Sequence, residues 1–174
     1  MATVVLPDPS LVLLVGAAGS GKSTFAARHF GADEVLSSDA MRARLSGDEA
    51  DQRVSRAAFA IIDDTLERRM QAGLLTVIDA TNADRRHRRS LLDRAEAVNV
   101  PAVALVLALP ARTVLERNAR RARRVDEQVV RRHLARVRAA LLPEGLAAEG
   151  YATIWVGRSP KEIDAVTIER VRTR

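Results

Sequence analysis

Residues 16–23, with the sequence GAAGSGKS, combine glycines, a lysine and a hydroxyl in the spacing of a phosphate-binding P-loop. The glycines let the backbone turn tightly and direct N–H groups at phosphate oxygens. We expect Lys22 to reach the β- and γ-phosphates of a nucleoside triphosphate and the Ser23 hydroxyl to ligate Mg²⁺. The residues assigned to triphosphate binding in this loop are Gly16, Gly19, Ser20, Gly21, Lys22, Ser23 and Thr24.

The cations of the chain are nearly all arginine. Two of the 28 Lys and Arg residues, Lys22 and Lys161, are lysines, so 26 are arginines. The chain thus keeps a compact ammonium in the loop where a point charge must follow a moving phosphoryl group. The net charge of +6 suits phosphates on a substrate or a nucleic-acid backbone. A GC-rich genome would produce the same excess of arginine, so the net charge alone does not decide the function.

Asp39 and Arg42 have the spacing expected of groups that act on a phosphoryl acceptor. They follow a short apolar run and lie three residues apart, so both side chains face the same side of a helix. A carboxylate there could serve as general base for the acceptor hydroxyl, and Arg42 could hold an acceptor phosphate bidentately. The alternative is that Asp39 caps the helix and Arg42 is solvated.

Asp79 ends the apolar run Leu74–Ile78, the pattern of a Walker-B strand whose carboxylate holds Mg²⁺ directly or through water. The same pattern arises when an aspartate caps the following helix. The P-loop upstream favours the metal site, and we assign Ser23 and Asp79 to Mg²⁺, or to Mn²⁺ in its place.

Two arginine clusters follow. Five arginines in residues 117–124 repel one another unless an anion is near, and they lie where nucleotide kinases carry a mobile lid that closes on the triphosphate. The cluster at Arg85–Arg89 could line an acceptor channel. For both clusters a solvated helix face is the alternative. The three histidines show no metal spacing, and we assign none to catalysis. Aromatic residues are scarce, so a platform that stacks bases on Phe or Tyr is not expected.

Short apolar runs alternate with longer segments of helical character. The runs predict strands at Leu11–Val15, Val35–Ser37, Leu74–Ile78, Val103–Ala108 and Thr153–Val156. The intervening segments predict helices at Lys22–Phe30, Ala40–Leu45, Asp51–Ala72, Asp84–Ala97, Ala111–Arg121, Asp126–Leu141 and Pro160–Arg170. This alternation predicts an α/β, P-loop kinase fold with a central, mostly parallel sheet of about five strands flanked by helices. The 174 residues suit one domain spanning residues 1–174.

The sequence contains no cysteine, no apolar run of membrane-spanning length and no charged start followed by an apolar stretch. We therefore expect a cytoplasmic protein that is not bound to a membrane. In an open α/β sheet the site lies at the carboxyl ends of the strands, so Asp39 and Asp79 are expected beside the P-loop.

The segments GAAGSGKSTFAARHF, LSSDAMRARLSGDEADQ, LTVIDATN and ERNARRARR resemble the 5′-hydroxyl polynucleotide kinase module of bacterial end-healing polynucleotide kinase-phosphatases. These enzymes belong with the phage polynucleotide kinases among P-loop phosphotransferases, and the resemblance covers nearly the whole chain. It implies that Asp39 is the general base for a 5′-OH and that Arg42 contacts the acceptor's first phosphodiester. In the lid the family arginines fall on Arg117, Arg121 and Arg124, of which the resemblance implies Arg121 and Arg124 as contacts of the ATP phosphates, whereas Arg120 and Arg123 are additional to the family pattern.

The resemblance implies transfer of the γ-phosphate of ATP or another NTP, with Mg²⁺ or Mn²⁺, to the 5′-OH of single-stranded or end-exposed RNA or DNA in end healing and RNA repair. Kinase modules of this family form homodimers and are joined to phosphatase and often ligase modules, so the chain is expected to be a standalone kinase or a module of a larger repair protein. Two alternatives stay open from the sequence: a small-molecule P-loop kinase, and a nucleotide-regulated binding module that transfers no phosphate.

Overall fold

A parallel sheet of five strands forms the centre of the protein, whose computed structural model describes residues 2–47 and 55–172. The strands lie in the order β3-β4-β2-β5-β6. Their bounds are Leu11–Val15 for β2, Val35–Ser37 for β3, Thr76–Asp79 for β4, Ala102–Leu107 for β5 and Thr153–Gly157 for β6. Every residue of β2 and β5 is buried, as expected for a parallel sheet covered on both faces. The predicted fold class and the five predicted strands are confirmed.

Helices cover both faces of this sheet. They are α1 (Lys22–His29), α2 (Ser38–Ser46), α3 (Ser55–Gln71), α4 (Arg85–Ala97), α5 (Ala111–Ala119), α6 (Glu127–Ala140) and α7 (Pro160–Ala165), with a 3₁₀ turn η2 at Leu146–Ala148. Side chains alternate along β2: Val12 and Leu14 pack on Phe25 of α1, whereas Leu13 packs in a second core cluster with Leu66 of α3. Each face of the sheet therefore has its own core, and the two together fix the position of the strand ends.

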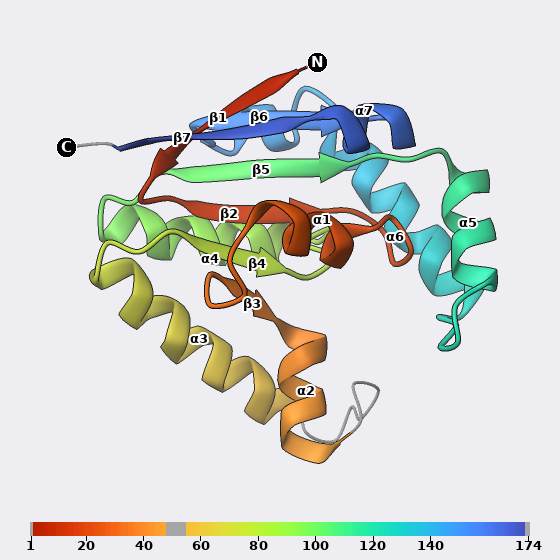
Figure 1. Cartoon of the computed structure of the whole chain (residues 1–174), viewed down its shortest axis with the longest axis horizontal. Helices are drawn as coiled ribbons and strands as arrows, with labels where there is room; N and C mark the ends of the chain where they lie inside the picture. The colour runs from red at the N-terminus through yellow and green to blue at the C-terminus, as the bar shows by residue number, and fades with distance from the viewer. Residues whose placement is uncertain (1, 48–54, 173–174) are drawn as a thin grey trace.

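The strand register brings three functional segments to one edge of the sheet. Leu14 of β2 pairs with Asp79 of β4, and Ser37 of β3 pairs with the same residue. The P-loop after β2, the start of α2 after β3 and the end of β4 are therefore neighbours. Figure 1 shows these strand ends opening toward α1, α2 and α5.

The two ends of the described chain form a second, two-stranded sheet that the sequence analysis did not predict. β1 (Thr3–Asp8) pairs in parallel with β7 (Thr167–Arg172), and β1 also contacts β6; Figure 1 shows the two strands crossing near the ends of the chain. The helix predicted at Pro160–Arg170 is therefore wrong beyond Ala165. The backbone turns extended at Val166, with φ −71° and ψ 141°, and the β-branched residues Thr167, Ile168 and Val171 that follow suit a strand.

The helix predicted at Asp51–Ala72 is observed as α3 from Ser55, and its first residues, 51–54, lie outside the described residues. In the parts of the chain that the structure describes, no helix has the length and apolar character needed to cross a membrane.

Candidate active site

The P-loop turns directly from β2 into α1. Gly19 and Gly21 have φ of +86° and +95°, in the left-handed region that L side chains rarely adopt. Gly21 is also the N-cap of α1, which begins at Lys22. The sequence needs glycine at these two positions so that the loop can close over the positive end of the helix dipole, where an anion is stabilised.

Lys22 is buried at the base of this loop, with 8% of its surface exposed. Its Nζ donates to the carbonyl oxygens of Gly16 and Ala17, each at 2.9 Å. Burial lowers the pKa of Lys22 to about 8, while the carboxylates of Asp79 and Asp39 act in the opposite direction. The ammonium is therefore held on weak neutral acceptors in a poorly solvated place, and a phosphate anion would stabilise its charge.

Asp79 and Ser23 place two oxygen donors beside Lys22. The Asp79 carboxylate is buried at the end of β4 and accepts a hydrogen bond from the Ser23 hydroxyl. Burial raises the pKa of Asp79, and the Ser23 bond and Lys22 partly offset this rise. Within the described residues there is no group of three or more His, Asp or Glu that could hold a metal by itself. One carboxylate and one hydroxyl fit Mg²⁺, which usually binds one or two protein oxygens and completes its shell with substrate phosphates and water.

Neither Asp39 nor Asp79 caps a helix. The N-cap of α2 is Ser37, whose hydroxyl accepts from the Ala40 amide at 3.3 Å. The N-cap of α4 is Asp84, whose carboxylate accepts from the amides of Arg86 and His87. The capping alternative is thereby removed for both aspartates, and both carboxylates line the cavity described below.

Asp39 and Arg42 form an ion pair across the first turn of α2. Only 9% of the Arg42 side chain is exposed, compared with 55% of the Asp39 side chain. The largely buried arginine therefore orients the carboxylate; both residues line the cavity, and Asp39 is the more open of the two. A solvated Arg42, the second half of the capping alternative, does not occur.

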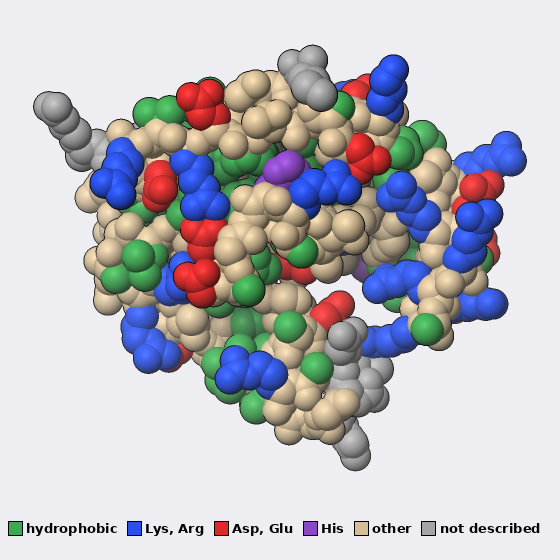
Figure 2. Space-filling model, viewed as in Figure 1, with side chains coloured by type: hydrophobic (Ala, Val, Ile, Leu, Met, Phe, Trp, Pro, Cys, Tyr) green, Lys and Arg blue, Asp and Glu red, His purple; other side chains and the backbone are tan. Residues whose placement is uncertain are grey.

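A cavity of about 1130 Å³ joins these groups. It extends from the P-loop past Asp39 to the facing sides of α3 and α4, and α5, α6 and α7 border it on the other side. This volume exceeds the range of about 300–1,000 Å³ that is common for small-ligand pockets. The cavity can therefore hold a triphosphate and a second molecule. Figure 2 shows the hollow on this face, with Lys and Arg side chains along its border at α5.

Three lid arginines line the cavity: Arg117, Arg121 and Arg123. Arg117 packs against the P-loop at Gly21, and the charge of Arg121 acts on Lys22. Arg124 matches the family pattern but does not line the cavity. Arg123, which is additional to that pattern, lines it instead. The helix predicted at Ala111–Arg121 ends at Ala119, so these last arginines lie in a loop.

Asn118 holds that loop in place, a role that the sequence analysis missed. Its Nδ2 donates to the Val125 carbonyl at 2.7 Å, and its Oδ1 accepts from the Val125 amide at 3.1 Å. The two bonds close the loop that carries Arg120 to Arg124. The local sequence does not distinguish this asparagine from its polar neighbours. Its role follows from its buried position at the end of α5, which only the structure shows.

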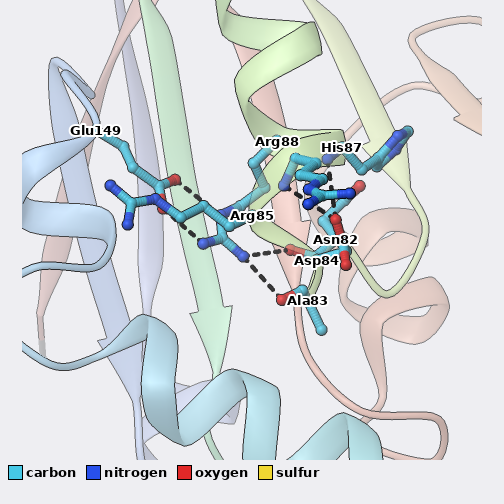
Figure 3. A network of polar contacts seen from close by, with 8 residues as sticks. Asn82, Ala83, Asp84, Arg85, His87, Arg88 and Glu149 are labelled. Carbon is cyan, nitrogen blue, oxygen red and sulfur yellow. Dashed lines mark hydrogen bonds and ion pairs between the residues drawn. The ribbon is translucent and has the colours of Figure 1, made fainter.

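The second arginine cluster divides into different environments. Arg88 is fully buried and donates to both carboxylate oxygens of Glu149, from Nε at 2.8 Å and from Nη2 at 2.6 Å. Its Nη1 donates to the carbonyls of Asn82 and Ala83, as Figure 3 shows. For Arg88, both expectations, an acceptor channel and a solvated face, are wrong. His87 lines the cavity, whereas Arg85 is exposed.

The Arg88 network fixes the loop that follows β4. Asn82, with φ of +44°, donates from Nδ2 to the carbonyls of Leu14 and Ile78 at 2.8 and 3.1 Å. The Thr81 carbonyl accepts from the Gly16 amide at 3.0 Å. Arg88 therefore acts on the P-loop through the backbone of this loop and touches no phosphate position itself.

His133 of α6 also lines the cavity. Its Nδ1 is buried and has no hydrogen-bond partner among the described residues. Burial lowers the pKa of His133, and the charge of Lys22 lowers it further. Both effects favour the neutral form of this imidazole.

The family comparison agrees with this geometry. A family model described as AAA domain (AAA_33) matches residues 11–143, so the chain belongs to this family of P-loop domains. No curated protein sequence matches the chain.

Solved structures show the same fold. A chain of the Pnkp1/Rnl/Hen1 RNA repair complex has a TM-score of 0.66 and 20% identity. The match covers 77% of the present chain but only 45% of the longer chain from the complex. A sugar kinase from Janibacter sp. has a TM-score of 0.57 and 20% identity, covering 89% of this chain and 90% of its own. A gluconokinase from Sinorhizobium meliloti has a TM-score of 0.53 and 16% identity, covering 91% of each chain. The protein therefore has a kinase-like P-loop fold. Because proteins with different names share this fold, the fold does not identify the substrate.

Proposed function

We propose that the protein transfers the γ-phosphate of ATP or another NTP to the 5′-OH end of RNA or DNA. The observation that carries this proposal is the Asp39 carboxylate, which is open to the cavity, takes no part in capping and is backed by the buried Arg42. It lies in the same cavity as the P-loop and Lys22. A phosphotransferase needs such a carboxylate where the acceptor hydroxyl meets the γ-phosphate.

In the proposed reaction the Asp39 carboxylate accepts the proton of the 5′-OH. The 5′ oxygen forms a bond to the γ-phosphorus as the bond from that phosphorus to the β,γ-bridging oxygen breaks, which leaves ADP. Lys22 and the lid arginines Arg117 and Arg121 stabilise the charge on the phosphoryl oxygens. When bound, Mg²⁺ would neutralise charge on the phosphates, and Ser23 and Asp79 would hold it. The protein contributes position and charge, and forms no covalent intermediate.

Support for a polynucleotide acceptor comes from Arg42 and from the size of the cavity. Arg42 lines the cavity beside Asp39, and its guanidinium would bind a phosphate next to the reacting hydroxyl, which a polynucleotide carries after its terminal nucleoside. Under this proposal the substrates are single-stranded or end-exposed strands. The phosphatase and ligase modules of a repair protein would be partners, and the kinase would form a homodimer.

A small-molecule kinase is the second candidate, because the sugar kinase and the gluconokinase align with about nine-tenths of this chain. The deciding experiment offers labelled γ-phosphate ATP and Mg²⁺ with a 5′-OH oligonucleotide, the same strand bearing a 5′-phosphate, and gluconate and common sugars. Label on the 5′-OH strand alone supports the proposal. Label only on a small acceptor would establish the second candidate, and ATP binding without any transfer would favour a regulated binding module.

A further inference from the structure

The acceptor side of the cavity has a wall built from two helices. Phe59 and Asp63 lie one helical turn apart on α3, and His87 and Arg94 lie two turns apart on α4, so each pair shares a helix face. All four residues line the same cavity as Asp39. The helix α2, which carries Asp39, packs against α3. An acceptor that reaches Asp39 therefore meets this wall.

Phe59 is the aromatic residue of this wall and is not part of the core. The chain has five aromatic residues, all within the described parts. Phe25 and Phe30 are buried, Trp155 stacks on Phe25 with ring centroids 5.9 Å apart, and Tyr151 packs against the second core cluster. Phe59, in contrast, is 42% exposed. Phe59 lines the cavity, whereas the adjacent α3 positions Ala58 and Ile62 are buried.

Hydrogen-bonding groups lie beside that ring. Arg94 Nη1 donates to Asp63 Oδ1 at 2.7 Å, and this bond links α3 to α4 across the wall. Both side chains are partly exposed. The bond uses one of the five N–H groups of the guanidinium and one oxygen of the carboxylate, so the pair can present both donors and an acceptor. The wall thus combines an apolar ring with a mixed polar edge.

We propose that this wall is a subsite for the terminal nucleobase of the acceptor, with Phe59 stacked on the base and the Asp63–Arg94 pair facing its edge. The inference rests on the proposed 5′-kinase function and names the part of the acceptor that the cavity holds. A nucleobase has two apolar faces and a polar edge, which matches this combination. Any of the bases can stack on an aromatic ring. The subsite should therefore bind a strand whose first nucleotide carries a base more tightly than an abasic one, with little preference among the bases. One ring suffices, although aromatics are scarce in the sequence.

The test compares two 5′-OH oligonucleotides that differ only in the first nucleotide, which carries adenine in one and is abasic in the other. Base stacking on an aromatic side chain corresponds to about a five- to hundred-fold change in affinity. Phe59→Ala is therefore expected to raise KM for the adenine acceptor within that range and to leave KM for the abasic acceptor unchanged. Ile61→Ala is the matched control, because Ile61 lies on the same helix, is 39% exposed and does not line the cavity.

An unchanged KM for ATP shows that the Phe59→Ala variant is folded. If that variant does not fold, Phe59→Leu keeps an apolar side chain without the aromatic face and makes the same comparison. Equal KM values for the two acceptors in the wild type, or equal effects of the substitution on both, would overturn the subsite and leave the kinase proposal standing. No transfer to either strand would overturn both.

Discussion

Replacing Arg88 is expected to destabilise the protein far more than replacing its neighbour on the same helix. In Arg88→Met the Glu149 carboxylate loses its buried ion-pair partner, and only 2% of the Glu149 side chain is exposed to water that could replace it. The carbonyls of Asn82 and Ala83 lose their donor as well. Removing one partner of a buried ion pair costs about 3–5 kcal/mol. Arg85 Nε lies 3.8 Å from Glu149 Oε1 and offsets part of the loss, so we expect about 3 kcal/mol.

Thermal unfolding measures this loss directly. For a chain of this size, 3 kcal/mol corresponds to a fall in Tm of about 6–12 °C. Arg89→Met is the matched control, since Arg89 pairs with Asp93 at 2.7 Å while more than half of each side chain is exposed. Such surface pairs contribute about 0–1 kcal/mol. A loss in Arg88→Met no larger than that in Arg89→Met would refute the role assigned to the buried pair.

Three further predictions concern Lys22 and the lid. Because burial lowers the pKa of Lys22 from 10.5 to about 8, the unfolded chain holds a proton between these values that the folded protein has released. The free energy of unfolding without ligand should therefore rise with pH across this window, by about 3 kcal/mol for this group. In Lys22→Met, denaturant titrations should show no such rise of the free energy of unfolding with pH. The same pH dependence in the variant and the wild type would contradict this prediction. In the lid, Arg121→Ala should lower kcat by about 10²–10³-fold, because the variant lacks a positive charge that stabilises the phosphoryl oxygens in the transition state. Arg123→Ala should lower kcat/KM for ATP more than Arg124→Ala, which does not line the cavity, and the reverse order would favour the family pattern over the observed geometry.

The central fold could be predicted because its signals are local. Five apolar runs form the strands of a parallel sheet, of which β2, β4 and β5 are buried along their whole length, and the glycines that open α1 are required by the backbone. The β1–β7 pair could not be predicted in the same way. Its strands lie at opposite ends of the chain, and β7 is largely exposed, so no continuous apolar run marks it. The helix predicted at Pro160–Arg170 is correct only as far as Ala165: Ser159 caps it and Pro160 begins it, whereas Thr167–Arg172 becomes a strand by pairing with the distant β1.

The candidate site divides in the same manner. Asp39 and Asp79 could be located because each follows a strand, but the sequence left capping open until Ser37 and Asp84 were found in the cap positions. The buried Arg88 could not be distinguished from the exposed arginines around it, since its partner Glu149 is 61 residues away. The position of Arg123 on the cavity wall likewise depends on how Asn118 closes the lid loop.

The proposed role of Asp39 is tested most directly by phosphoryl transfer with Asp39→Asn, which keeps the shape of the side chain and removes its charge. A general base contributes about 10²–10⁴-fold to the rate. We expect transfer to a 5′-OH oligonucleotide, measured under single-turnover conditions, to fall by this factor while the Kd for ATP stays within about twofold, since the P-loop is untouched. Transfer at the wild-type rate in this variant would contradict the account.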